Sequence, residues 1–253
     1  MASRILILMY GAVSYAIFFG TFLYAIGFVT GAFVPLTLDG EPRMAVGPAV
    51  AIDLSLLALF AIQHSVMARR GFKQWFTRFI PQAAERSTYV LASSLALIAL
   101  FYFWQPIGGV IWKVDDPTGR IVLYALGAFG WALVLVSTFL INHFDLFGLR
   151  QVWLHARGKP YRPLPFGTPG LYRVVRHPLY LGWFFAFWAT PTMTVAHLVF
   201  ALATTAYILL AIQLEERDLM RAHPEYGEYR GRVPMVIPFL KAGRGEGKRT
   251  RVA

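Results

Sequence analysis

The sequence contains apolar stretches that are long enough to cross a lipid bilayer. Four of them occupy residues 5–34, 46–67, 88–112 and 121–141, and each is close to or longer than the ~20 residues that span the hydrocarbon core as a helix. Charged residues make up only 15% of the chain and hydrophobic residues 57%, whereas a soluble domain carries about 25% charged residues. The sequence therefore predicts an all-α fold, a polytopic transmembrane helical bundle.

The basic residues predict how these helices are oriented in the membrane. The formal net charge is +11, and 20 of the 24 lysine and arginine residues lie in residues 69–87, 143–178 and 217–253. Basic loops thus alternate with loops that are balanced or acidic, as the positive-inside rule describes for cytoplasmic loops. This pattern predicts a cytoplasmic N-terminus and attraction to anionic membrane lipid, and it argues against nucleic acid as a partner. The basic, aromatic segment 68–79 is typical of a helix that lies on the membrane surface.

A fifth membrane element is interrupted by a proline. Residues 178–190 would extend over about 20 Å as a helix, which is too short for a hydrocarbon core of about 30 Å, while residues 193–214 are long enough. We interpret the pair as a helical hairpin that enters and leaves the membrane on the cytoplasmic side, with its turn at Pro191 and Thr192. The bundle then has about five transmembrane elements, the last of them this hairpin.

The two feet of the hairpin carry charged residues. Arg176 and His177 precede the first arm, and Glu215 and Glu216 end the second, so a chain that returns to the same face brings the four together. Anchoring by basic residues and ion pairing within the helix are the structural explanations. However, acidic residues at a cytoplasmic, C-terminal helix end oppose both the positive-inside bias and the helix dipole, and carboxylates accept hydrogen bonds from ligand hydroxyls. We therefore expect a polar ligand site at the cytoplasmic membrane face.

The chain divides into three regions. Residues 1–142 hold the first four predicted helices with the cytoplasmic loop 69–87. Residues 143–240 hold a long cytoplasmic loop, the hairpin and a C-terminal cofactor-binding region. Residues 241–253 are predicted to be a disordered basic tail. Asp53 and His197 lie within apolar segments. We expect both to pair with neighbouring helices, although an ionisable residue such as Asp53 is also a functional candidate by default.

The residue types exclude some chemistry. The chain has no cysteine, which excludes disulfides, thiolate metal sites and cysteine nucleophiles. Its six histidines are scattered, and no spacing among them predicts a metal site.

Several motifs in a fixed order carry a family resemblance. "RHPLYLG" at residues 176–182, "EERDL" at residues 215–219 and "HPEYGEYRGRVPMVIPF" at residues 223–239 resemble the integral membrane methyltransferases related to isoprenylcysteine carboxyl methyltransferase and the phospholipid N-methyltransferases. Upstream, "FAIQHSVMAR" at residues 60–69 and "NHFDLFGLRQVW" at residues 142–153 are similar to bacterial methanethiol S-methyltransferases.

This resemblance implies both a reaction and a cofactor. We expect methyl transfer from S-adenosylmethionine to a small thiol, with methanethiol converted to dimethyl sulfide, at the cytoplasmic face of the bacterial inner membrane. One alternative is a methyltransferase that acts on a lipid amine or a carboxylate. Another is a non-enzymatic membrane protein associated with denitrification, or a transporter, although the chain lacks the internal repeats of many transporters. The oligomeric state is not predicted.

The resemblance also implies which residues bind the cofactor. The family motifs and their surroundings assign this role to Tyr172, Arg176, His177, Tyr180, Gly182, Glu215 and Glu216. Tyr226 and Tyr229 are further candidate walls, because tyrosine faces attract a sulfonium cation. Gly182 would let the backbone approach the cofactor closely.

A thiol substrate also requires a way to lose its proton. Cysteine titrates near 8.5, so a thiol is mostly protonated at neutral pH and a base or a positive field is needed. His64 is the first candidate for the catalytic base, with His143 and Tyr180 as further catalytic candidates. The candidate substrate-binding residues are Gln63, Ser65, Asn142 and Asp145. The structural alternatives are a histidine bonded to a neighbouring helix and simple capping of a loop.

Overall fold

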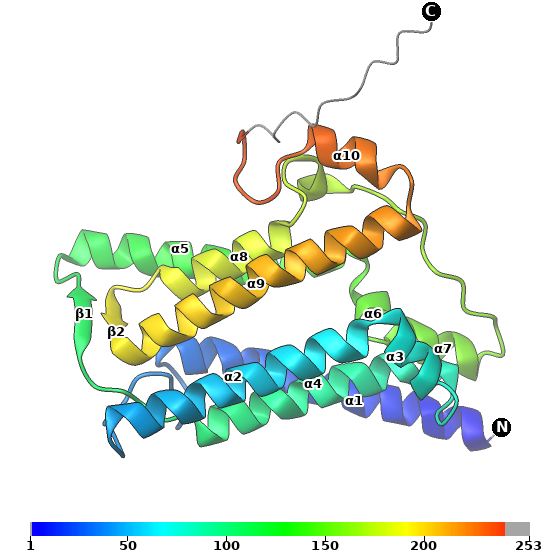
Figure 1. Cartoon of the computed structure of the whole chain (residues 1–253). Helices are drawn as coiled ribbons and strands as arrows, with labels where there is room; N and C mark the ends of the chain where they lie inside the picture. Colours follow the sequence, from blue (N-terminus) through cyan, green and yellow to red (C-terminus); the bar gives the residue numbers. More distant parts are fainter. Residues whose placement is uncertain (1, 241–253) are drawn as a thin grey trace, which may run out of the picture.

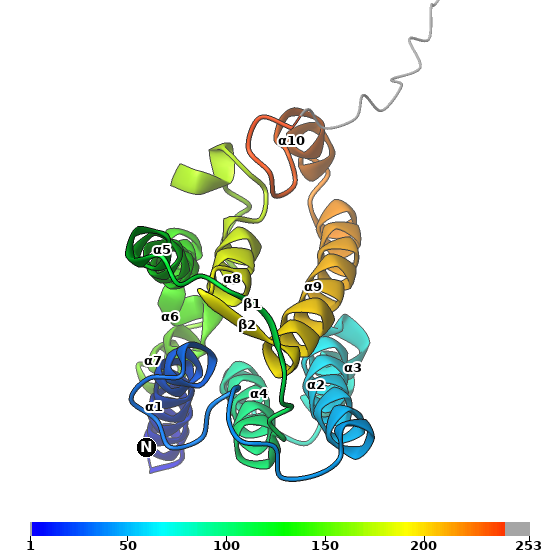
Figure 2. The same cartoon turned by 90° about the vertical axis from the view of Figure 1, so that its left-hand side faces the viewer.

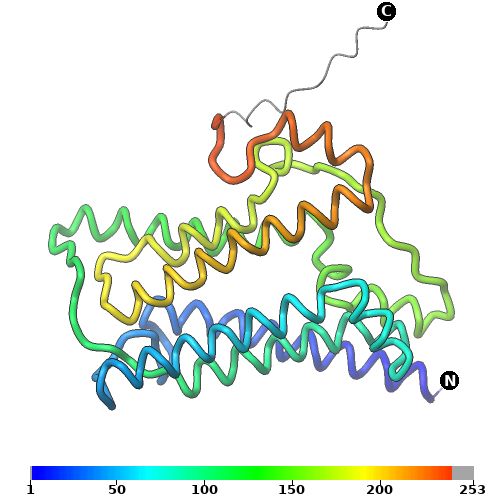
Figure 3. The backbone as a smooth tube through the Cα atoms, in the orientation of Figure 1, coloured from blue at the N-terminus to red at the C-terminus, as the bar shows by residue number. Residues whose placement is uncertain are grey.

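The computed structural model describes residues 2–240, and the predicted disordered tail at residues 241–253 lies outside this range. Five helices among the described residues are long and apolar enough to cross a membrane, which confirms the predicted polytopic bundle (Figure 1). They are α1 (Ala2–Thr30), α2 (Val46–Ala68), α4 (Gln82–Phe103), α5 (Pro117–Ile141) and α9 (Val195–Ala222). Figure 3 traces the chain through these helices from end to end.

Several of the predicted segments have different limits in the structure. Helix α5 begins at Pro117 rather than at residue 121, and α9 continues to Ala222 rather than ending at residue 214. The first helix ends at Thr30 rather than at residue 34, because Gly31 adopts a positive φ of 70° that a right-handed helix does not allow. The third was predicted at residues 88–112, but α4 runs from Gln82 to Phe103. Its first turn is polar and therefore lacks a hydropathy signal. Beyond its end, residues 105–109 include a proline and two glycines that stop the helix.

The remaining short elements lie between the spans. The basic, aromatic segment 68–79 contains a helix, α3 (Arg70–Phe76), while its position on the membrane surface stays a prediction. The long loop after α5 is partly helical, with α6 (His143–Leu146), α7 (Leu149–Ala156) and a 3-10 turn at Gly170–Arg173. The hairpin consists of α8 (Pro178–Trp188) and α9, and α10 (Tyr226–Arg232) follows it.

The helices are arranged as two groups that face each other. Helix α4 packs against α1 and α2, while α8 packs along α5, and α9 approaches α2. Figure 2 shows α5, α8 and α9 above α1, α4 and α2, with α10 at the top. We call the end that carries α3, α6, α7 and α10 the basic end, because it holds the basic segments 69–87, 143–178 and 217–232.

A small antiparallel ribbon joins the two groups at the opposite end. Strand β1 (Val110–Lys113), from the loop between α4 and α5, pairs with β2 (Thr192–Thr194) in the turn of the hairpin. The pairing sets Trp112 opposite Met193 and Lys113 opposite Thr192. The hairpin turn therefore lies at residues 189–194, as predicted, and the ribbon fixes it to the preceding loop.

Two polar residues inside apolar segments also hold this end together. The Asp53 carboxylate is fully buried and accepts a hydrogen bond of 2.8 Å from the backbone N–H of Gln105. The Nε2 atom of His197 lies 2.8 Å from the carbonyl oxygen of Phe187, so it joins the two arms of the hairpin. Both residues thus bond to neighbouring elements, as expected from the sequence.

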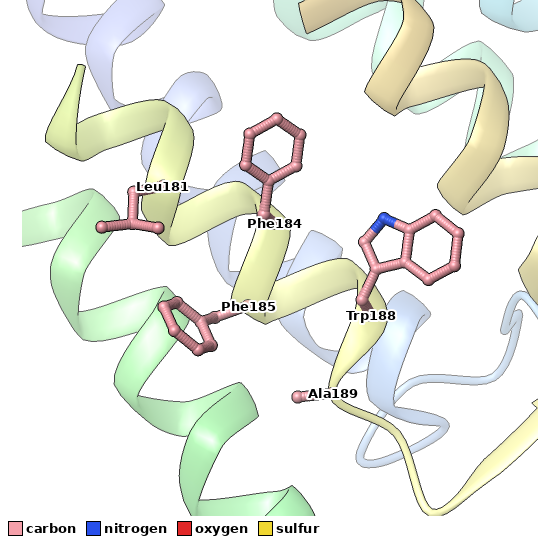
Figure 4. Close-up of a pocket in the computed structure, with 5 residues that line it drawn as sticks. All are labelled: Leu181, Phe184, Phe185, Trp188 and Ala189. Atoms are coloured by element: carbon pink, nitrogen blue, oxygen red, sulfur yellow. The ribbon is translucent and has the colours of Figure 1, made fainter. Parts of the chain in front are cut away.

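Helix α8 carries an apolar hollow that holds none of the predicted site residues. Leu181, Phe184, Phe185, Trp188 and Ala189 line this hollow of about 410 Å³, and Figure 4 shows their side chains along the helix. Their spacing of three and four residues places them on one helix face. The polar site described below lies closer to the first turn of α8.

Candidate active site

A buried carboxylate joins the feet of the hairpin at the basic end. Glu216 in α9 is only 3% exposed. Its Oε1 atom accepts hydrogen bonds from Arg176 Nε at 2.7 Å and from His177 Nε2 at 3.0 Å, and its Oε2 atom lies 3.0 Å from Arg230 Nε in α10. The structure therefore brings Arg176 and His177 together with the glutamate pair. Glu216 bonds these two residues, which lie about 40 positions earlier in the sequence, and not only residues of its own helix.

Backbone contacts complete this junction. The Nη1 atom of Arg176 donates to the carbonyl oxygens of Arg230 at 3.0 Å and of Val233 at 2.6 Å. The backbone N–H groups of Arg176 and His177 donate to the carbonyls of residues 234 and 235. The carboxylate and the guanidinium thus each have three contacts to protein groups, and the contacts of Glu216 support a role in anchoring α10 and the segment after it.

Glu215 differs from Glu216 in exposure and in partners. Its side chain is 47% exposed, and its Oε2 atom accepts a hydrogen bond of 3.0 Å from the Tyr180 hydroxyl. The His177 Nδ1 atom lies 3.9 Å from the same oxygen. Of the two glutamates, Glu215 therefore has the carboxylate that is open to a ligand.

Aromatic residues of α10 and of the loop before α8 pack together near these charged residues. The Tyr229 hydroxyl donates to the carbonyl oxygen of Tyr172 at 2.6 Å, and Phe166 packs edge-on against Tyr226 and Tyr229. Tyr226 is 2% exposed, yet its hydroxyl has no hydrogen-bond partner among the described residues. Burial raises the pKa of Tyr229 to about 12 and raises the pKa of Tyr226, so both phenols stay protonated and can donate hydrogen bonds at neutral pH.

Tyr172 lies at the α5 side of the same wall. Its hydroxyl is 3.5 Å from the carbonyl oxygen of Ser137. Burial, followed by the charge of Glu215, raises the pKa of the Tyr172 phenol. This phenol therefore stays in its neutral form at neutral pH.

Gly182 lies in a helix contact. A Cβ atom at this position would be 2.8 Å from the carbonyl oxygen of Gly130 in α5 and 2.8 Å from the side chain of Val134. A Cβ atom at Gly130 would in turn be 2.7 Å from the carbonyl oxygen of Gly182. Paired glycines of this kind let two helix backbones approach closely, so helix packing accounts for this glycine. The predicted approach of the backbone to the cofactor stays a prediction.

His64 and Ser65 in α2 have partners on two other helices. The Oγ atom of Ser65 is 3.1 Å from the Tyr207 hydroxyl in α9. The Nδ1 atom of His64 is 3.1 Å from Ser93 Oγ, and its Nε2 atom is 2.8 Å from the Tyr89 hydroxyl, both in α4. The Ser65–Tyr207 contact and an ion pair of 2.8 Å between Arg69 and Asp218 join this end of α2 to α9 on both sides of Glu215, so this group lies beside the part of α9 that carries the carboxylate.

Gln63, the third residue of that motif, is less connected. Its Nε2 atom contacts the sulfur of Met67 at 3.1 Å. Its buried Oε1 atom has no partner among the described residues.

The second predicted group lies in α6 and is occupied by local contacts. The Asn142 side chain accepts a hydrogen bond of 3.0 Å from the backbone N–H of Asp145, and Asp145 forms an ion pair of 2.7 Å with Arg150. His143 is buried, with Tyr15 at 2.8 Å from Nε2 and Thr138 at 2.8 Å from Nδ1. No side-chain hydrogen bond in residues 2–240 joins these three residues to Glu215 or to His64. Their contacts match the structural alternative of capping and pairing.

Sequence reasoning missed three residues of the site: Tyr89, Tyr207 and Arg230. Tyr89 and Ser93 lie on one face of α4, at a spacing of four residues. Both residues lie inside the segment predicted at residues 88–112, but nothing in that segment indicates that this face meets His64 in α2. No group of three or more possible metal ligands occurs among the described residues.

Comparisons with known proteins show what this chain is similar to. Residues 70–233 match a family model described as a protein of unknown function, DUF1295. The chain is 58% identical over 239 residues to a methanethiol S-methyltransferase of Crocosphaera subtropica, covering 94% of each chain. It is 54% identical over 237 residues to one of Mycobacterium tuberculosis, covering 93% of this chain and 97% of the relative. Nurim of Sus scrofa is 32% identical over 179 residues, which are 67% of this chain and 68% of that protein. No solved structure matches.

Proposed function

Since this chain belongs to the methanethiol S-methyltransferase family, we propose that it transfers a methyl group from S-adenosylmethionine to methanethiol, with dimethyl sulfide as the product. The observation that carries the proposal is the convergence of Arg176, His177 and the glutamate pair with the phenols of α10. We further propose that this basic end faces the cytoplasm of a bacterial cell, because it holds the basic segments.

The residues present fit S-adenosylmethionine in three respects. Glu215 offers a half-exposed carboxylate that can accept hydrogen bonds from ribose hydroxyls, as acidic residues do in dinucleotide sites. Tyr226 offers a buried hydroxyl without a partner among the described residues, which would gain one from a bound ligand. The phenol rings of Tyr172 and Tyr229 are neutral and can attract a sulfonium cation, with about 0.5–2 kcal/mol for each contact.

Each part of the site then has a distinct task. Glu216 and Arg176 hold α10 against the hairpin, and Glu215, Tyr180 and Tyr226 provide polar contacts for the cofactor. When bound, S-adenosylmethionine supplies an electrophilic methyl group on a positively charged sulfur. The thiol must lose its proton to become a competent nucleophile.

We propose His64 as the base for this proton rather than His143. His64 lies next to Ser65 in the part of α2 that contacts α9 beside Glu215. His143 instead bonds Tyr15 in α1 and Thr138 in α5, and no side-chain hydrogen bond among residues 2–240 joins it to that part of α2. Methanethiol is small and weakly polar, so it can reach an intramembrane base such as His64 from the bilayer.

Two measurements on the detergent-purified protein test this function. Calorimetry measures the binding of S-adenosylhomocysteine, and headspace analysis detects dimethyl sulfide after methanethiol and S-adenosylmethionine are added. We expect binding and product from the wild type. Glu215→Gln should weaken binding about tenfold or more, because a hydrogen bond to a charged group is lost. The control is Glu225→Gln, which changes an exposed carboxylate 3.7 Å from His223 and should leave binding unchanged.

The possible outcomes separate the alternatives. Binding without dimethyl sulfide would contradict the thiol acceptor and favour a lipid amine or a carboxylate, which labelled methyl groups would reveal in extracted lipid. An absence of binding in a folded sample would contradict the methyltransferase and favour an accessory protein or a transporter.

A further inference from the structure

We propose that the strap, the segment of residues 159–169, positions the phenols of the cofactor site and is anchored at one end by Asp145. This inference rests on the proposed function, because it concerns the same binding site for S-adenosylmethionine. It also gives the motif "NHFDLFGLRQ" at residues 142–151 a task. Asp145 acts as a positioning residue for the cofactor rather than as a contact of the thiol.

The first end of the strap is clamped by α6 and α7. The Nη1 atom of Arg150 donates to Asp145 Oδ1 at 2.7 Å and to the carbonyl oxygen of Arg162 at 3.2 Å. The Tyr161 hydroxyl donates to Asp145 Oδ2 at 3.3 Å, and the guanidinium carbon of Arg150 lies 5.2 Å from the centre of the Tyr161 ring. The side chains of Arg150 and Asp145 are only 27% and 19% exposed, so this ion pair is better shielded from water than one between fully exposed side chains.

The second end of the strap packs on α10. The ring of Phe166 has its centroid 5.4 Å from the ring of His223 and 5.7 Å from the rings of Tyr226 and Tyr229. Helix α10 has seven residues, fewer than the roughly 12–15 that an isolated helix needs in water, so it depends on contacts of this kind. Phe166 therefore packs against both phenols of α10, including the Tyr226 hydroxyl that has no partner among the described residues.

The strap between these two ends is stiff. Prolines stand at positions 160, 163, 165 and 169, and the ring of each one fixes its φ. Tyr161 and Phe166 are five positions apart, which is about 15 Å in an extended, proline-rich chain. Such a segment acts as a semi-rigid spacer. A displacement at the clamp is therefore passed on to Phe166.

The strap also leads directly into the other half of the site. It ends at the 3-10 turn Gly170–Arg173, and Arg173 Nε donates to the carbonyl oxygen of Thr168 at 3.2 Å. The same turn contains Tyr172, whose carbonyl oxygen accepts the hydrogen bond from Tyr229. Figure 1 shows this part of the chain running from α7 to the turn beneath α10. The strap thus joins the clamp to both groups of aromatic residues in the site.

The main test compares Asp145→Ala with the wild type. We expect the Kd of S-adenosylhomocysteine to rise about tenfold, a size found for residues that act through a packed network. We expect kcat at saturating cofactor and the KM for methanethiol to stay the same. A residue that binds the thiol would instead raise this KM and leave the Kd unchanged. Calorimetry reports the binding-competent fraction as a stoichiometry, separately from the Kd, so partial unfolding does not imitate the result.

A matched variant controls for the loss of an ion pair. Asp115→Ala removes an exposed carboxylate that pairs with Lys113 at 2.8 Å, at the end of the bundle opposite the strap. It should change neither the Kd of S-adenosylhomocysteine nor the KM for methanethiol.

Variants of Phe166 test the other end of the strap. Phe166→Ala should weaken the binding of S-adenosylhomocysteine about as much as Asp145→Ala does, and Phe166→Tyr, which keeps the ring, should bind like the wild type. The double variant with alanine at both positions should bind no more weakly than Phe166→Ala alone, because the anchor acts through this ring. Two independent residues would give additive losses of binding free energy.

A spin label measures the order of the strap without cofactor or thiol. The chain has no cysteine, so Leu164→Cys, at a position that is 38% exposed, provides a single site for a nitroxide. Electron paramagnetic resonance should show a more mobile label when Asp145→Ala is added, and an unchanged label when Asp115→Ala is added.

The contrary results separate this inference from the proposed function. An unchanged Kd in Asp145→Ala, a raised KM for methanethiol, additive losses in the double variant or an unchanged label spectrum would each overturn the positioning role and leave the methyltransferase intact. If the wild type binds no S-adenosylhomocysteine, the proposed function fails and the positioning role fails with it.

Discussion

The two adjacent glutamates at the end of α9 should have separable roles. Glu216→Ala removes a buried carboxylate that contacts Arg176, His177 and Arg230. Glu215→Ala removes a half-exposed carboxylate with one hydrogen bond, from Tyr180. We expect the first change to detach the C-terminal segment and the second to leave that segment in place.

The structure sets the size of the effect. Removing one partner of a buried ion pair costs about 3–5 kcal/mol. Arg176 keeps its two hydrogen bonds to backbone carbonyls, so we expect a value near the lower end, about 3 kcal/mol. At about 1.4 kcal/mol per factor of ten, the segment that follows α9 would open roughly 100 times more often. Loss of the exposed Glu215 should cost less than about 1 kcal/mol.

Limited trypsin digestion measures this opening, because α10 contains cleavable arginines at positions 230 and 232. When opening and closing are faster than cleavage, the cleavage rate follows the population of the open form. We expect cleavage about 100 times faster in Glu216→Ala and nearly unchanged in Glu215→Ala. A third variant, Glu228→Ala, removes an exposed carboxylate of α10 that is 3.6 Å from Arg232, and it serves as the control. Equal cleavage of wild type and Glu216→Ala would refute the anchoring role.

Three further changes test the fold around the site. Gly182→Ala should lower stability by about 1–3 kcal/mol, because the new Cβ would lie 2.8 Å from the Gly130 carbonyl oxygen; thermal unfolding compares it with Gly20→Ala, where no atom lies within 4 Å. Burial lowers the pKa of His143 in the folded protein, so the unfolded chain takes up a proton at higher pH than the folded protein does. The free energy of unfolding should therefore fall as the pH drops below about 6.5. His143→Gln should flatten this part of the curve of unfolding temperature against pH. Asp53→Leu should cost about 1–3 kcal/mol, because a buried backbone N–H loses its acceptor, while Asp53→Asn keeps an acceptor and should cost less.

Each of these expectations has a contrary result. Equal unfolding temperatures for the two glycine variants would contradict the close helix contact. Parallel pH curves for wild type and His143→Gln would show that another group controls acid stability. If Asp53→Leu and Asp53→Asn lose the same stability, the carboxylate oxygen is not the feature that matters.

The sequence alone determined the membrane class and most of the spans, because a helix that crosses a bilayer must be apolar over nearly its whole length. It also indicated the hairpin, since residues 178–190 are too short to cross, and a chain that returns must bring Arg176 near Glu216. Polar first turns carry no such signal. For that reason the start of α4 was placed six residues too late.

Only the tertiary structure decided how these side chains are used. Glu215 and Glu216 are adjacent in the sequence and chemically alike, yet one is half-exposed and the other is buried against Arg176 and Arg230. Tyr89 meets His64 because α2 and α4 pack side by side, and local patterns do not encode which helices become neighbours. Hydropathy follows from each segment's own transfer into lipid, whereas burial and hydrogen bonding of a side chain depend on contacts with distant segments.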